Sequence, residues 1–409
     1  MGKMRVRRAI RVLEKEGVLS FSIKALQKAQ KRQQRNSVQR KIKLNFLVKE
    51  ADVLEADWTA RPYSPHKNKA TEPYTVNWVM SPPGKGEGGG HQNIFRFINH
   101  LIKQGYTCRA YLYSGRDFQD KKEAQTVFEK AHPGSSLTFE WLKGPMKPAD
   151  AVFATGWETA YPVFNDPGTA QKFYFVQDFE PYFHPVGTEY VLSENTYFFN
   201  FFGITAGNWL AHKLNKEYGM RTDHYDFGAD KKLYRFENSQ PRKNIFFYAR
   251  PVTTRRGFEL GIMTLDLFHK QNPDYEIILA GWDVSDYHLP FPYKNLKTLK
   301  LEQLSDIYNQ CAAGLVISLT NMSLMPLELL AAGTIPVVND GLNNTEVSNN
   351  PYIKYAHPSP ASLAQALTET VRRKDLPKYA RLASESVKGV NWETSVAKFE
   401  EILRSELHG

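Results

Sequence analysis

The chain has 409 residues, of which 42% are hydrophobic, so it can bury more than one sizeable core and we expect two lobes. Its two cysteines, Cys108 and Cys311, lie far apart with no third ligand beside either. This excludes a disulfide framework and a cysteine metal site, and it is typical of a reducing, cytoplasmic compartment. No segment reaches the roughly 18 apolar residues that span a bilayer, and residues 17–23 are too short for the core of a secretory signal. We therefore expect a soluble or peripheral protein.

The positive charge is concentrated at the N-terminus. Residues 1–43 hold 14 Lys or Arg and two Glu, a net charge of +12, whereas the remaining residues hold 39 basic and 41 acidic side chains. The body is therefore not expected to bind nucleic acid. Apolar residues at helical spacing predict two short helices in this arm, separated by Gly17. Two interpretations stay open: an amphipathic arm that binds an anionic membrane surface or an acidic partner, and a solvated helix that packs on the body.

Strand and helix patterns alternate from residue 75 onward, which is typical of parallel sheets. Before them, residues 52–73 contain three prolines and are interpreted as a connector. The predicted strands are 75–80, 108–113, 151–154, 172–177 and 202–206 in the first lobe, and 243–249, 275–281, 313–319 and 334–338 in the second. The predicted helices include 91–104, 120–131, 190–199, 208–218 and a final helix, 392–407, that crosses back to the first lobe.

The fold class predicted from this alternation is α/β, with two doubly wound, Rossmann-like lobes facing across a cleft. The expected domains are the helical arm 1–43, a first lobe 44–235 completed by 391–409, and a second lobe 236–390, with a hinge near 231–243.

A glycine-rich loop follows the first predicted strand. Gly84, Gly86 and Gly89 fit G-x-G-x-x-G, the fingerprint of dinucleotide-binding folds. Such a fold needs a carboxylate at the end of its second strand, but that strand ends in Tyr113, Ser114 and Gly115. An oxidoreductase is therefore disfavoured. The glycines still allow a close backbone approach to a ligand, so we expect the loop to form the floor of a cleft.

Two segments of the second lobe are candidates for binding a diphosphate. Arg250 ends a predicted strand, and Arg255 and Arg256 precede a glycine and a helix; guanidinium groups at strand ends match phosphate oxygens. In residues 318–338, the backbone N–H groups of Ser323, Leu324 and Met325 open a helix and are expected to bind phosphate. Glu328, one turn on, is a candidate for a ribose hydroxyl, although a carboxylate there also serves as a helix cap.

These segments resemble the GT-B glycosyltransferases of the large retaining group that uses sugar nucleotides. The hallmark of that group, roughly E-G-F-G-L-x-P-L-E-A-x-A-x-G-x-P-V-V, matches Thr320, Asn321, Met322, Ser323, Leu324, Met325, Pro326, Leu327, Glu328, Gly333, Pro336, Val337 and Val338. Its diphosphate arginine matches Arg250, and its lysine before a glycine matches Arg256. Residues 228–234 resemble its G-V-D-x-x-x-F element, and the Gly88-Gly89-Gly90 loop resembles its first-lobe glycine loop.

The departures from that pattern narrow the resemblance. Thr320 stands where the group has the first glutamate of its pair, which usually contacts a donor-sugar hydroxyl, and Ser323 replaces a glycine. Together with residues 174–185, these changes most resemble bacterial rhamnosyltransferases that build rhamnan chains, such as those of S-layer glycans. The donor so implied is dTDP-β-L-rhamnose, transferred with retention of configuration onto a growing, lipid-linked glycan.

The resemblance and the residues together give a set of expected roles. Arg250 and Arg256, with Asp178 and Glu180, form the expected catalytic set, and either carboxylate alternatively caps a neighbouring helix. The expected nucleotide contacts are Arg250, Arg255, Arg256, Lys300, Ser323, Leu324, Met325 and Glu328. The expected sugar contacts are Gly88, Gly89, Gly90, His91, Asp178, Thr320 and Asn321.

No D-x-D triplet occurs in the chain, so metal-independent chemistry with no cofactor besides the donor is expected. The alternatives are a non-catalytic sugar-nucleotide or glycan-binding protein on the same fold, and a transferase that uses a UDP- or GDP-sugar. The expected location is the cytoplasm, with the basic arm on the inner face of the membrane.

Overall fold

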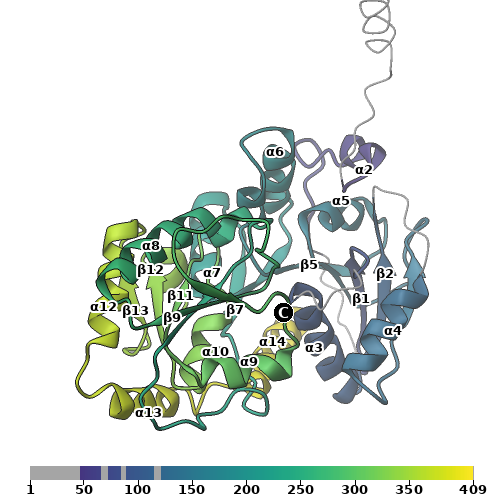
Figure 1. The fold of residues 1–409 in the computed structure, drawn as a ribbon. Coiled ribbons are helices and arrows are strands. Elements are labelled where there is room, and N and C mark those ends of the chain that lie inside the picture. The colour runs from purple at the N-terminus through teal and green to yellow at the C-terminus, as the bar shows by residue number, and fades with distance from the viewer. Residues whose placement is uncertain (1–46, 66–71, 84–88, 115–120, 409) are drawn as a thin grey trace, which may run out of the picture. The chain divides into compact units, whose positions relative to one another are not determined.

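The computed structural model describes residues 47–65, 72–83, 89–114 and 121–408. The predicted basic arm, residues 1–43, lies outside the described residues, as does Gly88 of the glycine loop. Residues 47–409 form one compact unit that contains two parallel sheets with helices on their faces (Figure 1). The predicted α/β class with two doubly wound lobes is confirmed.

The first sheet has seven parallel strands in the order β3-β2-β1-β4-β5-β6-β7. Its strands are β1 (Thr75–Met80), β2 (Thr107–Leu112), β3 (Thr138–Trp141), β4 (Ala151–Ala154), β5 (Gln171–Val176), β6 (Phe202–Ala206) and β7 (Thr222–Tyr225). The helices of this part are α2 (Glu50–Glu55), α3 (Gly89–Lys103), α4 (Lys121–Ala131), α5 (Trp157–Asn165), α6 (Thr188–Asn195) and α7 (Asn208–Tyr218), with short 3₁₀ turns η1 (Glu180–Phe183) and η2 (Thr196–Phe198). The central strands are runs of buried apolar residues, as expected when helices cover both faces.

The second sheet has six parallel strands in the order β10-β9-β8-β11-β12-β13. Its strands are β8 (Asn244–Tyr248), β9 (Glu276–Ala280), β10 (Tyr293–Asn295), β11 (Cys311–Val316), β12 (Ile335–Asn339) and β13 (Lys354–Ala356). The helices are α8 (Phe258–Gln271), α9 (Leu301–Tyr308), α10 (Met325–Ala331), α11 (Leu342–Thr345), α12 (Pro360–Val371) and α13 (Leu376–Ser386), with the 3₁₀ turn η3 (Thr254–Arg256). One buried apolar core joins this sheet to α8 and α12.

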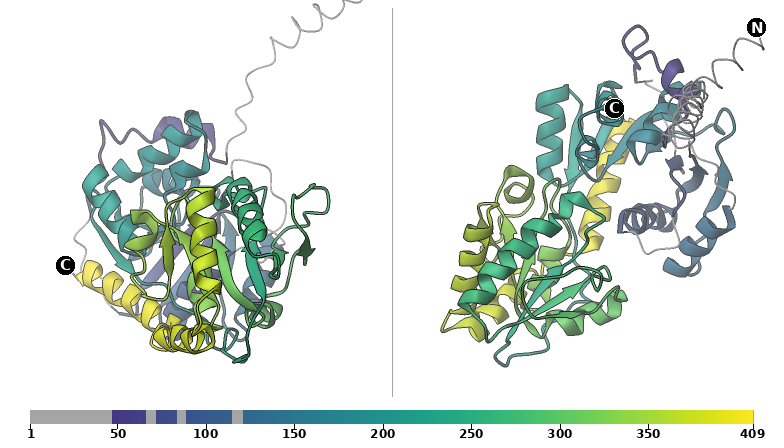
Figure 2. Two further views of the ribbon diagram at one scale, coloured as in Figure 1. Left: turned by 60° about the vertical axis from the view of Figure 1, so that its left-hand side comes forward. Right: turned by 45° about the horizontal axis from the view of Figure 1, so that its top comes forward.

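The last helix, α14 (Trp392–His408), returns to the first sheet and packs on α3 and β7; it is yellow in Figure 2. Phe399 of α14 is fully buried and lies 4.9 Å, ring centre to ring centre, from Phe97 and 6.0 Å from Trp78. Aromatic burial of this size anchors the C-terminal helix to the core of the first sheet. None of the described helices is long and apolar enough to cross a membrane.

Several elements differ from the sequence predictions. The connector predicted over 52–73 contains the end of α2, and the helix predicted over 190–199 is α6 followed by the turn η2. The helix α5 was not predicted, and it contains Pro162, a residue that argues against a helix because it removes an N–H donor. The strands missed are β3, β7, β10 and β13, which have three or four residues each and no continuous apolar run.

Candidate active site

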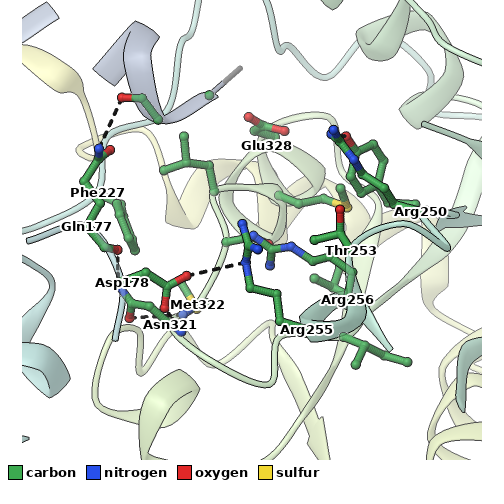
Figure 3. Close-up of a pocket in the computed structure, with 18 of the residues that line it drawn as sticks. Gln177, Asp178, Phe227, Arg250, Thr253, Arg255, Arg256, Asn321, Met322 and Glu328 are labelled. Atoms are coloured by element: carbon green, nitrogen blue, oxygen red, sulfur yellow. Dashed lines mark hydrogen bonds and ion pairs between the residues drawn. The ribbon is translucent and has the colours of Figure 1, made fainter. Parts of the chain in front are cut away.

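A cavity of about 550 Å³ is lined by residues that follow the carboxyl ends of strands in both sheets (Figure 3). This is the edge at which open parallel sheets bind ligands. Among the predicted site residues, the cavity brings together Gly89, Gly90, Asp178, Glu180, Arg250, Arg255, Arg256, Asn321, Ser323, Leu324, Met325 and Glu328. These residues come from segments up to 239 positions apart, so the fold itself assembles the cluster.

The arginines enter the cavity from the segment after β8. Arg256 donates from Nη1 to Ser318 Oγ at 2.9 Å, and burial lowers its pKa. Arg250 is exposed and donates from Nη1 to the Tyr248 hydroxyl at 3.0 Å. Gly257 ends the η3 turn at φ +55°, and a Cβ there would lie 2.6 Å from Ile317, so only glycine lets the chain turn this closely after Arg256.

Arg255 lies between the arginine segment and the first sheet. Its guanidinium carbon stands 4.2 Å from the centre of the Phe183 ring, and Nε is 3.7 Å from Asp178 Oδ2. In Figure 3 this side chain points toward Asp178. Arg255 Nε and the buried Ser323 hydroxyl have no hydrogen-bond partner among the described residues. Buried polar groups are normally paired, so two unpaired groups lining one cavity favour a polar ligand there.

The start of α10 completes this side of the cavity. The backbone N–H of Ser323 donates to Ser318 Oγ at 3.3 Å, so this predicted phosphate donor already has a partner. The N–H groups of Leu324 and Met325 stand at the start of α10, where the backbone has no partner within the helix. Ser318 therefore links Arg256 and the loop before α10 through one hydroxyl.

Asp178 joins the two sheets at the edge of the cavity. Its Oδ2 accepts from the Thr320 hydroxyl at 2.9 Å and its Oδ1 from the Asn321 N–H at 2.8 Å. The Asn321 amide donates in turn to the carbonyls of Gln177, at 3.1 Å, and Ala206, at 2.8 Å. Burial raises the pKa of Asp178, against the opposing effects of the Asn321 N–H and Arg255. Asp178, Thr320 and Asn321, each predicted to contact sugar, therefore contact one another.

Glu180 serves a structural contact as well as lining the cavity. Its Oε2 accepts from the N–H of Trp157, the first residue of α5, at 2.5 Å and from the Tyr174 hydroxyl at 3.2 Å. The helix-capping alternative considered for this carboxylate thus matches its observed contacts. Burial raises the pKa of Glu180, and the carboxyl group of Glu158 raises it further.

Glu328 stands in the first turn of α10 and faces two tyrosines. Burial raises its pKa to about 7, while the hydroxyls of Tyr308 and Tyr234 and the charge of Arg96 act in the opposite direction. Tyr234 and Tyr308 also line the cavity, with stacked rings 5.7 Å apart. This corner of the cavity offers a carboxyl group, two hydroxyls and aromatic faces, a combination suited to a nucleoside.

Comparisons with known proteins agree with this architecture. The chain is 9% identical to TarM of S. aureus, whose crystal structure contains UDP, with a TM-score of 0.65 over 82% of this chain and all of TarM. It is 14% identical to HepE of Anabaena in complex with UDP-glucose, with a TM-score of 0.60 over 82% of this chain and 99% of HepE. The fold is GT-B.

Sequence comparison adds two similarities. Residues 243–368, which run from β8 into α12, match the family model described as WsaF, C-terminal domain. The O-antigen biosynthesis protein RfbC of Myxococcus xanthus is 30% identical over 338 residues. That match covers 79% of this chain and 26% of RfbC, so the chain spans about a quarter of its relative's length.

Four predicted residues do not line the GT-B cavity as described. His91 bonds through Nε2 to the Ser81 carbonyl at 2.8 Å, and burial lowers its pKa. Lys300 precedes α9, whose residues Leu301 and Leu304 line the cavity in its place. Thr320 is 2% exposed and uses its hydroxyl on Asp178, and Gly88 lies outside the described residues. Among the described residues, no group of three or more His, Cys, Asp or Glu side chains is placed to hold a metal ion.

Sequence reasoning missed the partners of the predicted residues. Tyr248, Phe183, Ser318 and Tyr308 line or brace the GT-B cavity but were not singled out. Tyr248 had a detectable signal, because residues two apart on a strand project from the same face as Arg250. Phe183 and Ser318 had none, since their roles depend on contacts with Arg255 and Arg256 that form only in the fold.

Proposed function

We propose that this chain is a glycosyltransferase that moves a sugar from a nucleoside diphosphate onto a glycan. The observation that carries the proposal is the convergence of Arg250, Arg255 and Arg256 on one cavity at the carboxyl ends of the second sheet. Three guanidinium groups with one nearby carboxylate, Asp178, form a site that favours a diphosphate. The similarity to an O-antigen biosynthesis protein and to structures holding UDP or UDP-glucose supports this direction.

The chemistry follows from the charge that develops when the anomeric C–O bond breaks. The leaving nucleoside diphosphate gains negative charge in the transition state, and cations fixed in advance stabilise it without reorganisation, by typically ~10²–10³-fold for one donor. Arg256 is fixed by Ser318, and Arg255 is held over Phe183. Arg250 is exposed at the cavity wall and free to follow the phosphate as the donor enters.

The finer proposal is that the donor is dTDP-β-L-rhamnose and that transfer retains the anomeric configuration without a metal ion. It rests on the resemblance of residues 174–185 and 320–338 to bacterial rhamnosyltransferases and on the absence of a D-x-D triplet from the sequence. The acceptor would be a growing, lipid-linked glycan. The basic arm, residues 1–43, would hold the enzyme on the cytoplasmic face of an anionic membrane.

A second function, non-catalytic binding of a sugar nucleotide or glycan, is favoured by one observation. Thr320 occupies the place of a glutamate in the motif that the chain resembles, and its hydroxyl is used on Asp178. Incubation with labelled dTDP-rhamnose and a rhamnosyl acceptor separates the two functions. A transferase forms a labelled product that grows with time, whereas a binding protein retains the donor and forms none.

The donor class is tested by thermal unfolding of the full chain with dTDP, UDP, GDP and NAD. A ligand that binds the folded state stabilises it by about 2.7 kcal/mol at a concentration 100 times its Kd. We expect dTDP to raise the melting temperature most and NAD to leave it unchanged. A larger shift with UDP or GDP would replace the rhamnose donor, and a shift with NAD alone would overturn the glycosyltransferase proposal.

A further inference from the structure

A second cavity, of about 650 Å³, lies where α3, the turn after β7 and the start of α14 meet. Its cationic side chains come from separate segments: Arg96 and Lys103 from α3, and Lys231 and Lys232 from the turn. A Cβ at Gly228 would lie 2.5 Å from the Trp392 backbone nitrogen, so glycine allows this turn to approach α14 closely. The fold therefore brings four positive charges to one concave surface.

These charges are not neutralised by the protein around them. None of the four cations forms an ion pair with a carboxylate of the described residues, and the nearby Glu400 pairs with His100 at 2.8 Å. The ammonium of Lys231 donates to the backbone carbonyl of Lys388. The two carboxylates of the cavity wall are Asp230 and Glu393, and Asp230 already accepts from the Lys232 N–H at 3.0 Å.

Arg96 has the geometry of an anion-binding residue. Its guanidinium carbon lies 4.0 Å from the centre of the Trp392 ring, and Nη1 donates to Asn93 Oδ1 at 2.8 Å. Stacking and this bond fix the guanidinium plane and leave its other N–H groups for a ligand. A fixed guanidinium fork matches two oxygens of one phosphate group.

The two cavities are neighbours along α3. Asn93 lines the first cavity, and its hydrogen-bond partner Arg96 lines the second. A molecule in the second cavity thus lies beside the site proposed for sugar transfer, on residues separate from Arg250, Arg255 and Arg256.

We propose that this second cavity binds a phosphate or diphosphate ester, with Arg96 as its fork and Lys103, Lys231 and Lys232 as supporting charges. The excess of positive charge selects an anion, and the volume exceeds that of a single phosphate, so the ligand carries a further group. Two sources share this chemistry: the diphosphate end of a lipid-linked acceptor, and a free inorganic anion. The site goes beyond the proposed function, because binding there does not require that sugar transfer occur.

The experiment titrates the full chain with inorganic pyrophosphate by calorimetry and compares variants of matched charge. The test variants are Lys231→Ser/Lys232→Ser, whose side chains are exposed, and Arg96→Gln. The control is Lys130→Ser/Lys378→Ser, which removes the same charge from exposed positions outside the cavity. We expect binding about tenfold weaker in both test variants, because charge-assisted hydrogen bonds are lost, and unchanged in the control.

Nucleotide binding is measured on the same samples and is expected to stay within about twofold of the parent. This separates the two proposals, since a failure of nucleotide binding concerns only the first cavity. Unchanged pyrophosphate affinity in both test variants, or an equal loss in the control, would overturn the second site. A short-chain isoprenyl diphosphate that binds more tightly than pyrophosphate identifies the lipid-linked source, and tighter binding of pyrophosphate identifies the free anion.

Discussion

Removal of the Arg250 guanidinium separates catalysis from folding more cleanly than any other change in the first cavity. The side chain is exposed, and its hydrogen bond within the described residues is to the Tyr248 hydroxyl at 3.0 Å. Truncation of such a surface group changes the free energy of unfolding by no more than about 0.5 kcal/mol. If Arg250 neutralises the leaving diphosphate, Arg250→Ala should instead lower the transfer rate about 10²–10³-fold, or roughly 2.7–4 kcal/mol of transition-state stabilisation.

Arg256→Ala provides an informative comparison. It should lower the rate to a similar extent, but it also leaves the half-buried Ser318 hydroxyl without the guanidinium that donates to it at 2.9 Å. A lost hydrogen bond of this kind costs about 1–3 kcal/mol of stability. The two arginines should therefore look alike in turnover and differ in urea unfolding.

The assay is the initial rate of transfer of labelled sugar, with the unfolding midpoint measured on the same preparations. The control is Arg373→Ala, another exposed arginine of the second lobe with one polar partner, Asp375, at 3.0 Å. Its rate should equal that of the parent. Turnover of Arg250→Ala within a few-fold of the parent would remove the diphosphate from this arginine.

Four further changes test other parts of the chain. Glu180→Gln keeps an oxygen for the Trp157 N–H and replaces a carboxyl whose pKa is raised by burial, so activity should stay within a few-fold; a hundredfold loss at an unchanged melting temperature would assign Glu180 to proton transfer. Glu328 has a folded-state pKa of about 7, above its ordinary 4.5, so its favourable contribution to stability is complete below pH 4.5 and is lost as the pH rises through 7. Glu328→Gln should remove that loss, gaining about 3 kcal/mol on the parent between pH 4.5 and 8 in urea unfolding, and a constant difference would contradict the shift. Thr320→Glu places a second carboxylate against Asp178 and should lower the melting temperature by several degrees at pH 8 but less at pH 5, unlike Thr320→Ser. Deletion of residues 1–43 should weaken sedimentation with anionic liposomes and preserve activity on a soluble acceptor; unchanged sedimentation would end the membrane proposal.

The sequence predicted the fold where its physical signal is local. The central strands of both sheets are continuous buried apolar runs, which a parallel sheet covered on both faces requires, and they were predicted within one to three residues. The edge strands β10 and β13 have three residues each, too few for any pattern to rise above the surrounding loops. Their strand geometry depends on pairing with β9 and β12, which is tertiary information.

The candidate site divides in the same way. Arg250, Arg255 and Arg256 were placed correctly on the cavity because a strand end, a glycine and a helix start follow one another in the sequence. The contacts of Glu180 were open until the fold was known, because its partner Trp157 lies 23 residues away, at the start of a helix that the sequence did not predict. His91 follows the glycines in sequence, yet its ring bonds to the Ser81 carbonyl and does not line the cavity.

Thr320 and Asp178 explain each other only in space. Taken alone, Thr320 looks like the loss of a carboxylate from a motif that usually carries one. In the fold, its hydroxyl donates to Asp178, 142 positions earlier, so one carboxylate does stand at this point of the cavity wall, supplied from the first sheet. A glutamate at 320 would face that carboxylate in a buried setting that already raises the pKa of Asp178. The hydroxyl at 320 and the carboxylate at 178 are therefore one arrangement, and they leave the cavity with a single carboxyl group beside Arg255.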